Sequence, residues 1–268
     1  MKESCFEVRR ENLVIRGVSC FPDEAGKNLT PIILSHGFMS NHHIVENYAR
    51  EAVLRFGFCA FSFDFCGGCE VGESDGKTTD MSVFTECDDL KAIISYVRNR
   101  KEVDPDQLIL FGCSQGGLVS ALTAVQCSEW VRALILFYPA LCIPDDARKG
   151  HMMQAEFDPH EIPDVIPCGS VNLGKQYPES VMEMDPFKEI KGYQGPVLIV
   201  HGTKDPVVST SYARKAYEVY KERTSLDDSP NPSSQLVLLD GAGHGFTPEY
   251  AKQAMDAVEQ FLKKESLV

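Results

Sequence analysis

The sequence has no long apolar stretch and no long run of basic residues. Its longest apolar stretch, at residues 133–143, is interrupted by Pro139 and is much shorter than the ~20 residues that span a bilayer. Lysine and arginine number 26 against 39 acidic residues, and they form no run that would make a basic surface. The first ten residues are charged and lack the apolar segment of a secretory signal. We therefore expect a cytoplasmic protein that binds neither membranes nor nucleic acids.

Cysteine, in contrast, is abundant, with ten residues in a chain of 268. A chain of this length can bury a core without disulfides, and cysteines such as Cys59, Cys127 and Cys142 lie in apolar segments. We therefore expect free, buried thiols. Cys66 and Cys69 have the C-x-x-C spacing of a zinc site, but one pair without nearby histidines is a weak signal. We predict loop cysteines there, with no bound metal and no cofactor.

Short apolar runs alternate with longer helical patterns along the chain. This alternation predicts an α/β fold, with a mostly parallel sheet covered by helices on both faces. The strand-like runs are a hairpin at 5–10 and 13–19, followed by 31–35, 58–63, 108–111, 133–138, 196–200 and 235–239. The helical patterns lie at 90–97, 115–127 and 248–263.

The alternation is interrupted between residues 140 and 189, where prolines recur and no strand–helix unit is recognisable. A long irregular segment inside a compact domain is usually functional. We predict a core formed by residues 1–139 and 190–268, with 140–189 inserted as a lid over the carboxyl edge of the sheet. The alternative is an ordinary surface excursion. A second irregular stretch, at 224–234, is predicted to be a solvated loop.

The strongest functional motif lies between a strand-like run and a helical pattern. Residues 112–116 read Gly-Cys-Ser-Gln-Gly, a G-x-S-x-G pattern. In this context the glycines permit a sharp strand-to-helix turn that raises the Ser114 hydroxyl above the edge of the sheet. The start of the helix also directs free N–H groups toward a developing negative charge. We predict that Ser114 is a nucleophile; the alternative is a glycine-rich turn whose serine caps the helix.

A serine nucleophile needs a base and a third group that orients the base. His244 follows the last strand-like run in a glycine-rich segment, and Asp205 follows the run 196–200 after a short loop. Asp205 in this place can fix the tautomer of His244 and stabilise its imidazolium. The alternatives are a surface histidine and an Asp-Pro turn. Asp240 and Asp185 are weaker candidates, because one ends a strand and the other lies in the irregular interval.

Two backbone N–H groups are candidates for an oxyanion hole. The glycine after the run 31–35 permits a tight bend that turns the Phe38 N–H toward the site, and the Gln115 N–H follows the nucleophile directly. We predict that Phe38 and Gln115 are the two donors, and the alternative is a simple strand-to-helix turn. His36 and His201 lie between glycines and core strands, and we predict structural roles for them.

The motifs FGCSQGG, HGF, HGTKDPVV and GAGHGF together resemble those of serine esterases of the α/β-hydrolase superfamily, in which the order Ser, Asp, His is characteristic. The chain is most similar to the feruloyl (cinnamoyl) esterases of gut bacteria, also in the segments SDGKTTDMSVFTE and FDPHEIPD. The resemblance covers nearly the whole chain. It implies a catalytic triad of Ser114, Asp205 and His244, with Phe38 and Gln115 as oxyanion donors.

The resemblance also implies features outside the triad. A lid at about 140–185 would form an aromatic acyl pocket, and Asp146 would contact the phenolic hydroxyl of the substrate. Members of this family often dimerise, so a homodimer is implied as well. Two features depart from the family pattern: Cys113 precedes the nucleophile where the group usually has histidine, and the loop 66–73 is longer than its counterpart.

Motifs and resemblance together predict a serine carboxylic ester hydrolase that acts on a small-molecule ester. The predicted substrates are hydroxycinnamate esters or other small aryl or short-acyl esters. A lipase-like, thioesterase or small-peptide acyl hydrolase would differ mainly in the lid. A catalytically inactive scaffold that only binds ligands is the alternative outside the enzymes, and the presence of every triad member argues against it.

Overall fold

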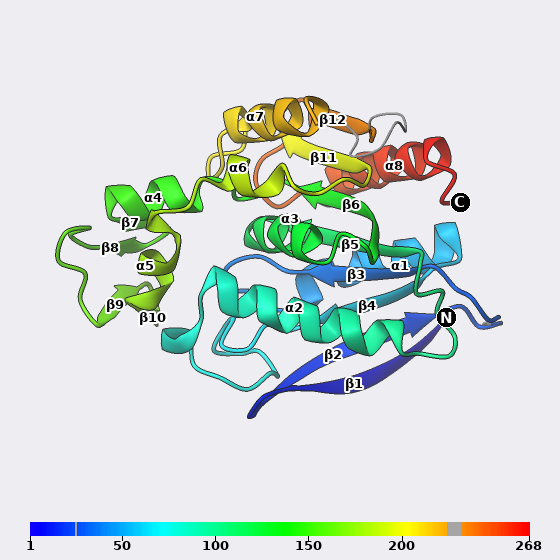
Figure 1. Cartoon of the computed structure of the whole chain (residues 1–268), viewed down its shortest axis with the longest axis horizontal. Coiled ribbons are helices and arrows are strands. Elements are labelled where there is room, and N and C mark those ends of the chain that lie inside the picture. Colours follow the sequence, from blue (N-terminus) through cyan, green and yellow to red (C-terminus); the bar gives the residue numbers. More distant parts are fainter. Residues whose placement is uncertain (25, 224–231) are drawn as a thin grey trace.

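The computed structural model describes residues 1–24, 26–223 and 232–268, and its centre is one sheet (Figure 1). The sheet has eight strands in the order β1-β2-β4-β3-β5-β6-β11-β12. β1 and β2 form an antiparallel hairpin, β2 pairs antiparallel with β4, and all later pairings are parallel. The mostly parallel sheet predicted from the sequence is therefore confirmed. The strands are β1 Lys2–Arg10, β2 Leu13–Phe21, β3 Pro31–Ser35, β4 Cys59–Phe63, β5 Leu108–Cys113, β6 Val131–Phe137, β11 Val197–Gly202 and β12 Ser234–Leu239.

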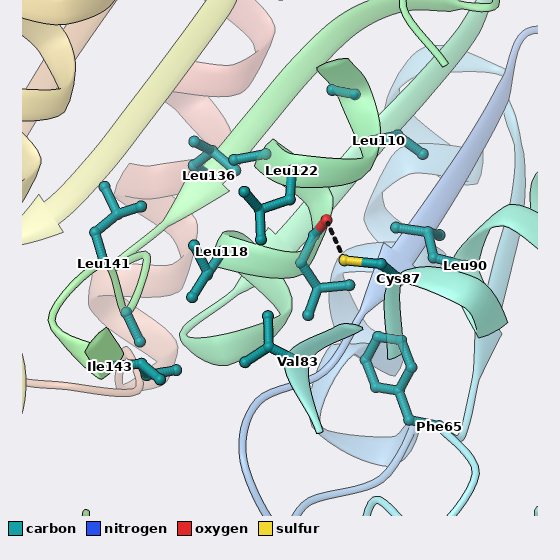
Figure 2. Close-up of a cluster of buried hydrophobic side chains, with 14 of the residues drawn as sticks. Phe65, Val83, Cys87, Leu90, Leu110, Leu118, Leu122, Leu136, Leu141 and Ile143 are labelled. Carbon is teal, nitrogen blue, oxygen red and sulfur yellow. Dashed lines mark hydrogen bonds between the residues drawn. The ribbon is translucent and has the colours of Figure 1, made fainter. Parts of the chain in front are cut away.

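Helices cover both faces of the sheet, and the alternating side chains of each strand contribute to two separate cores. In β5, Leu110 packs with the helices on one face, whereas Ile109 and Phe111 pack with those on the other. The first face is covered by α2 (Val83–Arg98), α3 (Gln115–Gln126) and α7 (Thr210–Lys221). The second is covered by α1 (His43–Phe56) and α8 (Pro248–Lys264). Figure 2 shows leucines of α3 meeting side chains of α2 in the first core.

Two of these helices, α1 and α7, lie where no helix was predicted. The buried residues of α1 include Val45, Tyr48, Ala49 and Ala52, which recur with helical spacing. The buried face of α7 is formed mainly by two alanines and is correspondingly weak as a hydrophobic signal. None of the helices within the described residues combines the length and the apolar composition that crossing a bilayer requires.

The interval between β6 and β11 contains short regular elements rather than irregular chain. Its first part is α4 Ile143–Lys149 with the hairpin β7 His151–Met152 and β8 Ala155–Glu156. A second hairpin, β9 Val165–Cys168 and β10 Val171–Gly174, precedes α5 Gln176–Met182. These elements lie together beyond one end of the sheet (Figure 1), and we call residues 140–189 the cap segment. The last helix of this interval, α6 Pro186–Ile190, packs against α3 and α7 instead.

The described structure accounts for only part of the second irregular stretch. Of the loop predicted at 224–234, residues 224–231 lie outside the described residues, and Ser234 already begins β12. Because β3, β5, β11 and β12 are parallel, their carboxyl ends reach the same edge of the sheet. The segments that follow these four strands carry the predicted triad and oxyanion donors, whereas Asp146 lies on α4 of the cap segment.

Candidate active site

Ser114 occupies a strained turn between β5 and α3. Its φ of 53° and ψ of −120° are unusual for a residue other than glycine. Position 116 of the motif requires a glycine, because a Cβ on Gly116 would lie 2.2 Å from the His36 carbonyl oxygen. Cys113, on the other side, packs into the core beneath α1 and α8. Burial raises the pKa of the Cys113 thiol to about 12, so this thiol is no rival nucleophile.

The structure brings Ser114, His244 and Asp205 into one hydrogen-bonded row. The Ser114 Oγ lies 2.9 Å from His244 Nε2, and His244 Nδ1 lies 2.8 Å from Asp205 Oδ2. Burial alone would raise the pKa of Asp205, but hydrogen bonds from His201, His244 and the Val208 N–H hold that pKa well below its usual range. The ionised carboxylate keeps the His244 proton on Nδ1, which leaves Nε2 free to accept the Ser114 proton.

The imidazole of His244 also packs against an aromatic side chain. The Tyr138 ring meets it edge to face, with 4.7 Å between ring centroids. Tyr138 follows β6 and was not among the predicted site residues. Its position directly after a core strand at the carboxyl edge of the sheet was the available signal.

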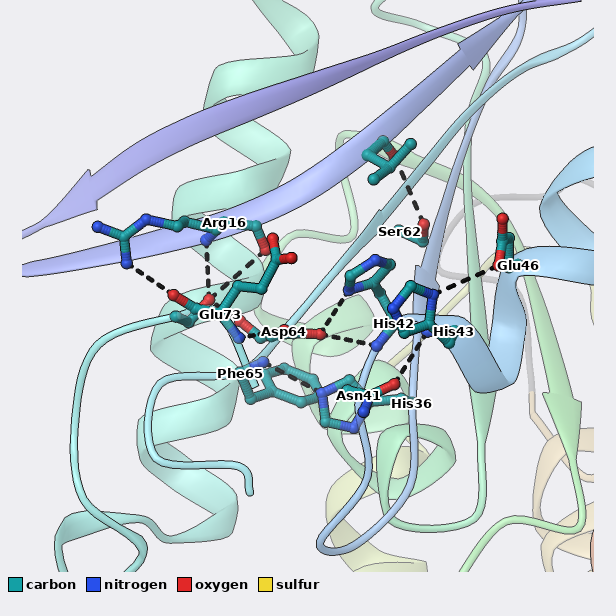
Figure 3. A network of polar contacts seen from close by, with 12 residues as sticks. Arg16, His36, Asn41, His42, His43, Glu46, Ser62, Asp64, Phe65 and Glu73 are labelled. Atoms are coloured by element: carbon teal, nitrogen blue, oxygen red, sulfur yellow. Dashed lines mark hydrogen bonds and ion pairs between the residues drawn. The ribbon is translucent and has the colours of Figure 1, made fainter. Parts of the chain in front are cut away.

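The Phe38 N–H belongs to a peptide that a buried histidine orients. His36 Nε2 accepts the Phe65 N–H at 3.1 Å (Figure 3). Its proton is therefore on Nδ1, which donates to the Gly37 carbonyl at 2.8 Å. Burial lowers the pKa of His36, which keeps the ring neutral. The two ends of a trans peptide point in opposite directions, so fixing the Gly37 carbonyl also fixes the Phe38 N–H. The structural role predicted for His36 is thus to orient the peptide that carries a candidate oxyanion donor, the Phe38 N–H.

The Gln115 N–H is oriented in the same way. The carbonyl of its peptide belongs to Ser114 and accepts the Gly117 N–H and the Ala140 N–H, each at 2.9 Å. Both candidate donors, Phe38 and Gln115, line the same cavity as Ser114. The two peptides are therefore prepared to present N–H groups there without further rearrangement.

The side chain of Gln115 joins the core to the cap segment. Its Nε2 donates to Glu86 Oε2 of α2 at 2.8 Å, and its Oε1 accepts the Tyr177 hydroxyl of α5. All three side chains are buried. Burial raises the pKa of Glu86 well above its usual value, because the hydrogen bond from Gln115 does not offset the loss of solvent. The Tyr177 ring also meets the Phe38 ring edge to face, with centroids 5.6 Å apart.

A cavity of about 330 Å³ opens beside Ser114. One wall follows the strands of the sheet and includes Pro206, Val207 and Val208; the other comes from the cap segment and includes Asp146 and Met152. Burial raises the pKa of Asp146 above its usual value. The lining of the cavity is thus mostly apolar. Its carboxyl group, that of Asp146, comes from the cap segment and not from the turn that carries Ser114.

The remaining candidates lie apart from this row. Asp240 Oδ1 accepts the Thr203 hydroxyl, and Asp185 accepts the Phe187 N–H at the start of α6. Cys66 and Cys69 are free thiols. Across residues 1–24, 26–223 and 232–268, no group of three or more His, Cys, Asp or Glu side chains is placed to hold a metal ion.

Buried hydrogen bonds between Asp64 and His42 fasten the loop that carries Phe38. Asp64, after β4, accepts both the backbone N–H and the Nδ1–H of His42 through Oδ1, at 2.7 and 2.8 Å (Figure 3). The carboxylate of Asp64 raises the pKa of His42, despite the opposing effect of burial. The loops after β3 and β4 are therefore held together by a charged hydrogen bond.

Comparisons with known proteins agree with this architecture. The uncharacterized protein YfhR of Salmonella typhimurium is 26% identical over 255 residues, which cover 90% of this chain and 73% of YfhR. Alpha/beta hydrolase domain-containing protein 17C of Xenopus tropicalis is also 26% identical, over 92% of this chain and 65% of its own length. Part of each relative therefore lies outside the match.

Two solved structures of esterases share the fold. Est1E from Butyrivibrio proteoclasticus, solved with ferulic acid bound, superposes with a TM-score of 0.86 at 24% identity, over 98% of this chain and all of Est1E. The Pyrococcus furiosus esterase Pf2001 gives 0.71 at 19% identity, over 98% of this chain and 92% of its own. The Hydrolase_4 family model, described as serine aminopeptidase, S33, matches residues 27–181. This match covers more than half of the chain, and with the fold it shows that the chain belongs to this family of α/β-hydrolases.

Proposed function

We propose that the protein is a serine carboxylic ester hydrolase that works through an acyl-enzyme. The observation that carries the proposal is the row from Asp205 through His244 to Ser114, ending in a cavity that two candidate oxyanion donors also line. A weak hydroxyl nucleophile, its base and the group that orients the base are all within hydrogen-bond distance.

In the first half of the reaction, Ser114 Oγ attacks the ester carbonyl carbon while His244 Nε2 takes the hydroxyl proton. Asp205 stabilises the imidazolium that results. The negative charge on the carbonyl oxygen is met by the N–H groups of Phe38 and Gln115, and one such donor contributes about 3 kcal/mol. The tetrahedral intermediate then expels the alcohol, which takes its proton from His244 Nε2. Water repeats these steps on the acyl-enzyme and releases the acid.

The proposed substrates are hydroxycinnamate esters or other small aryl or short-acyl esters. A cavity of about 330 Å³ is within the range of small-molecule sites. Its apolar lining suits an aromatic ring. Asp146 on α4 lines the same cavity, and we propose that its carboxyl group accepts a hydrogen bond from a substrate hydroxyl. The similarity to Est1E, which was solved with ferulic acid, supports the same class of substrate.

The assignment of the nucleophile is tested with Ser114→Ala and p-nitrophenyl acetate. We expect hydrolysis to fall by at least about a thousandfold, because the covalent route is lost. Labelling of the wild-type protein by a fluorophosphonate should depend on the same residue. Full activity in the Ser114→Ala variant would refute the mechanism, and a wild-type protein inert to both reagents would favour a binding scaffold. For the substrate class, clearly faster turnover of a long-chain p-nitrophenyl ester than of ethyl ferulate would contradict the aryl pocket.

The family description favours one second candidate, an aminopeptidase. Such an enzyme needs a carboxylate for the substrate ammonium group, and Asp146 is the acidic residue that lines the described cavity. Turnover of aminoacyl p-nitroanilides ahead of aryl esters would support this candidate instead.

A further inference from the structure

His201 contacts the same carboxylate oxygen as His244. It lies in β11, four residues before Asp205, and its side chain is fully buried. The His201 Nε2 is 2.9 Å from the Val208 carbonyl oxygen and 3.2 Å from Asp205 Oδ2. Both neighbours are acceptors, so Nε2 carries a proton, which it donates to the Val208 carbonyl while lying beside Asp205 Oδ2.

The other ring nitrogen of His201 establishes its charge state. Nδ1 is buried and has no hydrogen-bond partner within the described residues. A cationic ring would leave an N–H buried there without an acceptor, which costs more than a bare nitrogen lone pair. The geometry therefore describes a neutral imidazole with its proton on Nε2.

Asp205 consequently accepts four N–H groups. Its Oδ1 binds the Val207 and Val208 N–H groups at 2.8 and 2.9 Å, while Oδ2 is shared by His244 and His201. Another ionisable group near Asp205 is the Cys142 thiol, from the start of the cap segment, and burial keeps that thiol protonated. The surroundings of the carboxylate thus include two imidazoles, two backbone amides and a neutral thiol.

Sharing Oδ2 between two rings has two consequences for His244. The oxygen cannot swing away from His244 Nδ1 without also breaking its contact with His201. In addition, a carboxylate that already accepts several N–H groups presents less of its charge to the next one. His201 thus both fixes the direction of the Asp205–His244 hydrogen bond and moderates its strength.

We propose that His201 is a positioning residue for the reaction, acting through Asp205 on the basicity and orientation of His244. The inference rests on the proposed function, because it assigns His201 to the machinery that activates Ser114. A purely structural role would be met by the contact between Nε2 and the Val208 carbonyl alone, and it would leave the pH dependence of the reaction unchanged.

The test compares His201→Leu, which removes the donor, with His201→Gln, whose amide nitrogen takes the place of Nε2. The pH–rate profile on p-nitrophenyl acetate is measured together with the unfolding temperature. In His201→Leu we expect kcat to fall about tenfold with KM within about twofold, since one hydrogen bond to a charged group is lost. The acid limb should move to higher pH, because the unshared carboxylate holds the His244 imidazolium more firmly. His201→Gln should recover most of both effects.

Two further variants separate this role from folding. Val200→Ala, the neighbouring position on β11, removes core packing on the opposite face and should lower the unfolding temperature without moving the acid limb. His201→Asn, too short to reach Asp205 Oδ2, should behave as His201→Leu does and replaces it if the leucine variant does not fold.

The outcomes distinguish failure of this inference from failure of the proposed function. An acid limb and kcat equal to wild type in the variants without the donor would overturn the role of His201, as would a His201→Gln variant that recovers neither. A wild-type protein that neither hydrolyses the ester nor reacts with a fluorophosphonate would overturn the proposed function first, and the role of His201 with it.

Discussion

Two aspartates near Ser114, Asp205 and Asp146, have opposite environments, and their pKa values are shifted in opposite directions. Asp205, after β11, has a fully buried side chain and a pKa held well below its usual range by N–H donors that outweigh the cost of burial. Asp146, on α4 of the cap segment, keeps 32% of its side-chain surface exposed, and burial raises its pKa. Its nearest cation, the Lys149 ammonium, is 4.0 Å away.

The difference separates the two walls of the cavity. On the wall that follows the strands, backbone N–H groups and buried rings fix each polar group before a substrate arrives, which is what a charge-stabilising site requires. On the cap wall the carboxyl group of Asp146 is partly exposed, and its nearest cation is too distant for a short ion pair. We therefore propose that residues on the sheet wall carry the chemistry and that residues on the cap wall select the substrate. Changes on the two walls should then differ in both size and substrate dependence.

The largest effect is expected from Asp205→Asn. The amide cannot hold the proton of His244 on Nδ1 in the same way and does not stabilise the imidazolium, so kcat should fall by about 10⁴-fold. Because the defect concerns the base, the loss should be equal for p-nitrophenyl acetate and ethyl ferulate. A loss confined to one of these esters would contradict the proposed division of roles between the sheet wall and the cap wall.

An intermediate effect concerns Glu86, which lies where the two walls meet beneath Gln115. Its folded-state pKa is raised, so between the ordinary glutamate pKa of about 4.3 and the raised value the native state binds the proton that the unfolded state releases. Stability of the wild type should therefore fall as pH rises through this window, by up to about 1.4 kcal/mol per pH unit. Glu86→Gln keeps an acceptor for Gln115 and lacks this proton.

Urea unfolding at pH 5 and pH 8 measures the predicted difference. Glu86→Gln should gain stability relative to wild type at pH 8 more than at pH 5. Glu86→Ala should be less stable at both values, since it leaves the Gln115 amide unpaired. A Glu86→Gln variant whose stability relative to wild type is the same at both pH values would mean that the native carboxyl is ionised like an exposed one.

The sheet wall could be predicted from sequence because its signals are local. Short apolar runs mark the strands, and Ser114, Asp205 and His244 each follow one of them closely. Parallel pairing then brings the strand ends to one edge, whatever the distance along the chain. The fold class and the residues that meet at that edge follow from these facts.

The cap wall and the buried supports could not be predicted in the same way. Strands of two residues, such as β7 and β8, are too short to show a period, and α4 and α5 have only seven residues each. The roles of His36, Glu86 and Tyr177 depend on tertiary contacts, such as the one between Tyr177 and Gln115 across 62 residues of sequence. Periodicity identifies positions as buried, but it does not identify the polar partner whose hydrogen bond offsets the free-energy cost of burying a polar side chain.

The smallest effect, and the most selective, is expected from Asp146→Asn. If the carboxylate of Asp146 accepts a hydrogen bond from a substrate hydroxyl, the KM for ethyl ferulate should rise by about three- to tenfold, because a neutral amide oxygen is a weaker acceptor than a carboxylate oxygen. Ethyl cinnamate, which has no hydroxyl on its ring, should be turned over as by wild type. Asp145→Asn is the matched control, because Asp145 accepts the Tyr212 hydroxyl and pairs with Arg148 outside this cavity. Equal changes for both esters, or the same change in Asp145→Asn, would show that Asp146 stabilises the cap segment and does not contact the substrate hydroxyl. Substrate selection would then depend on the apolar residues of the cap wall.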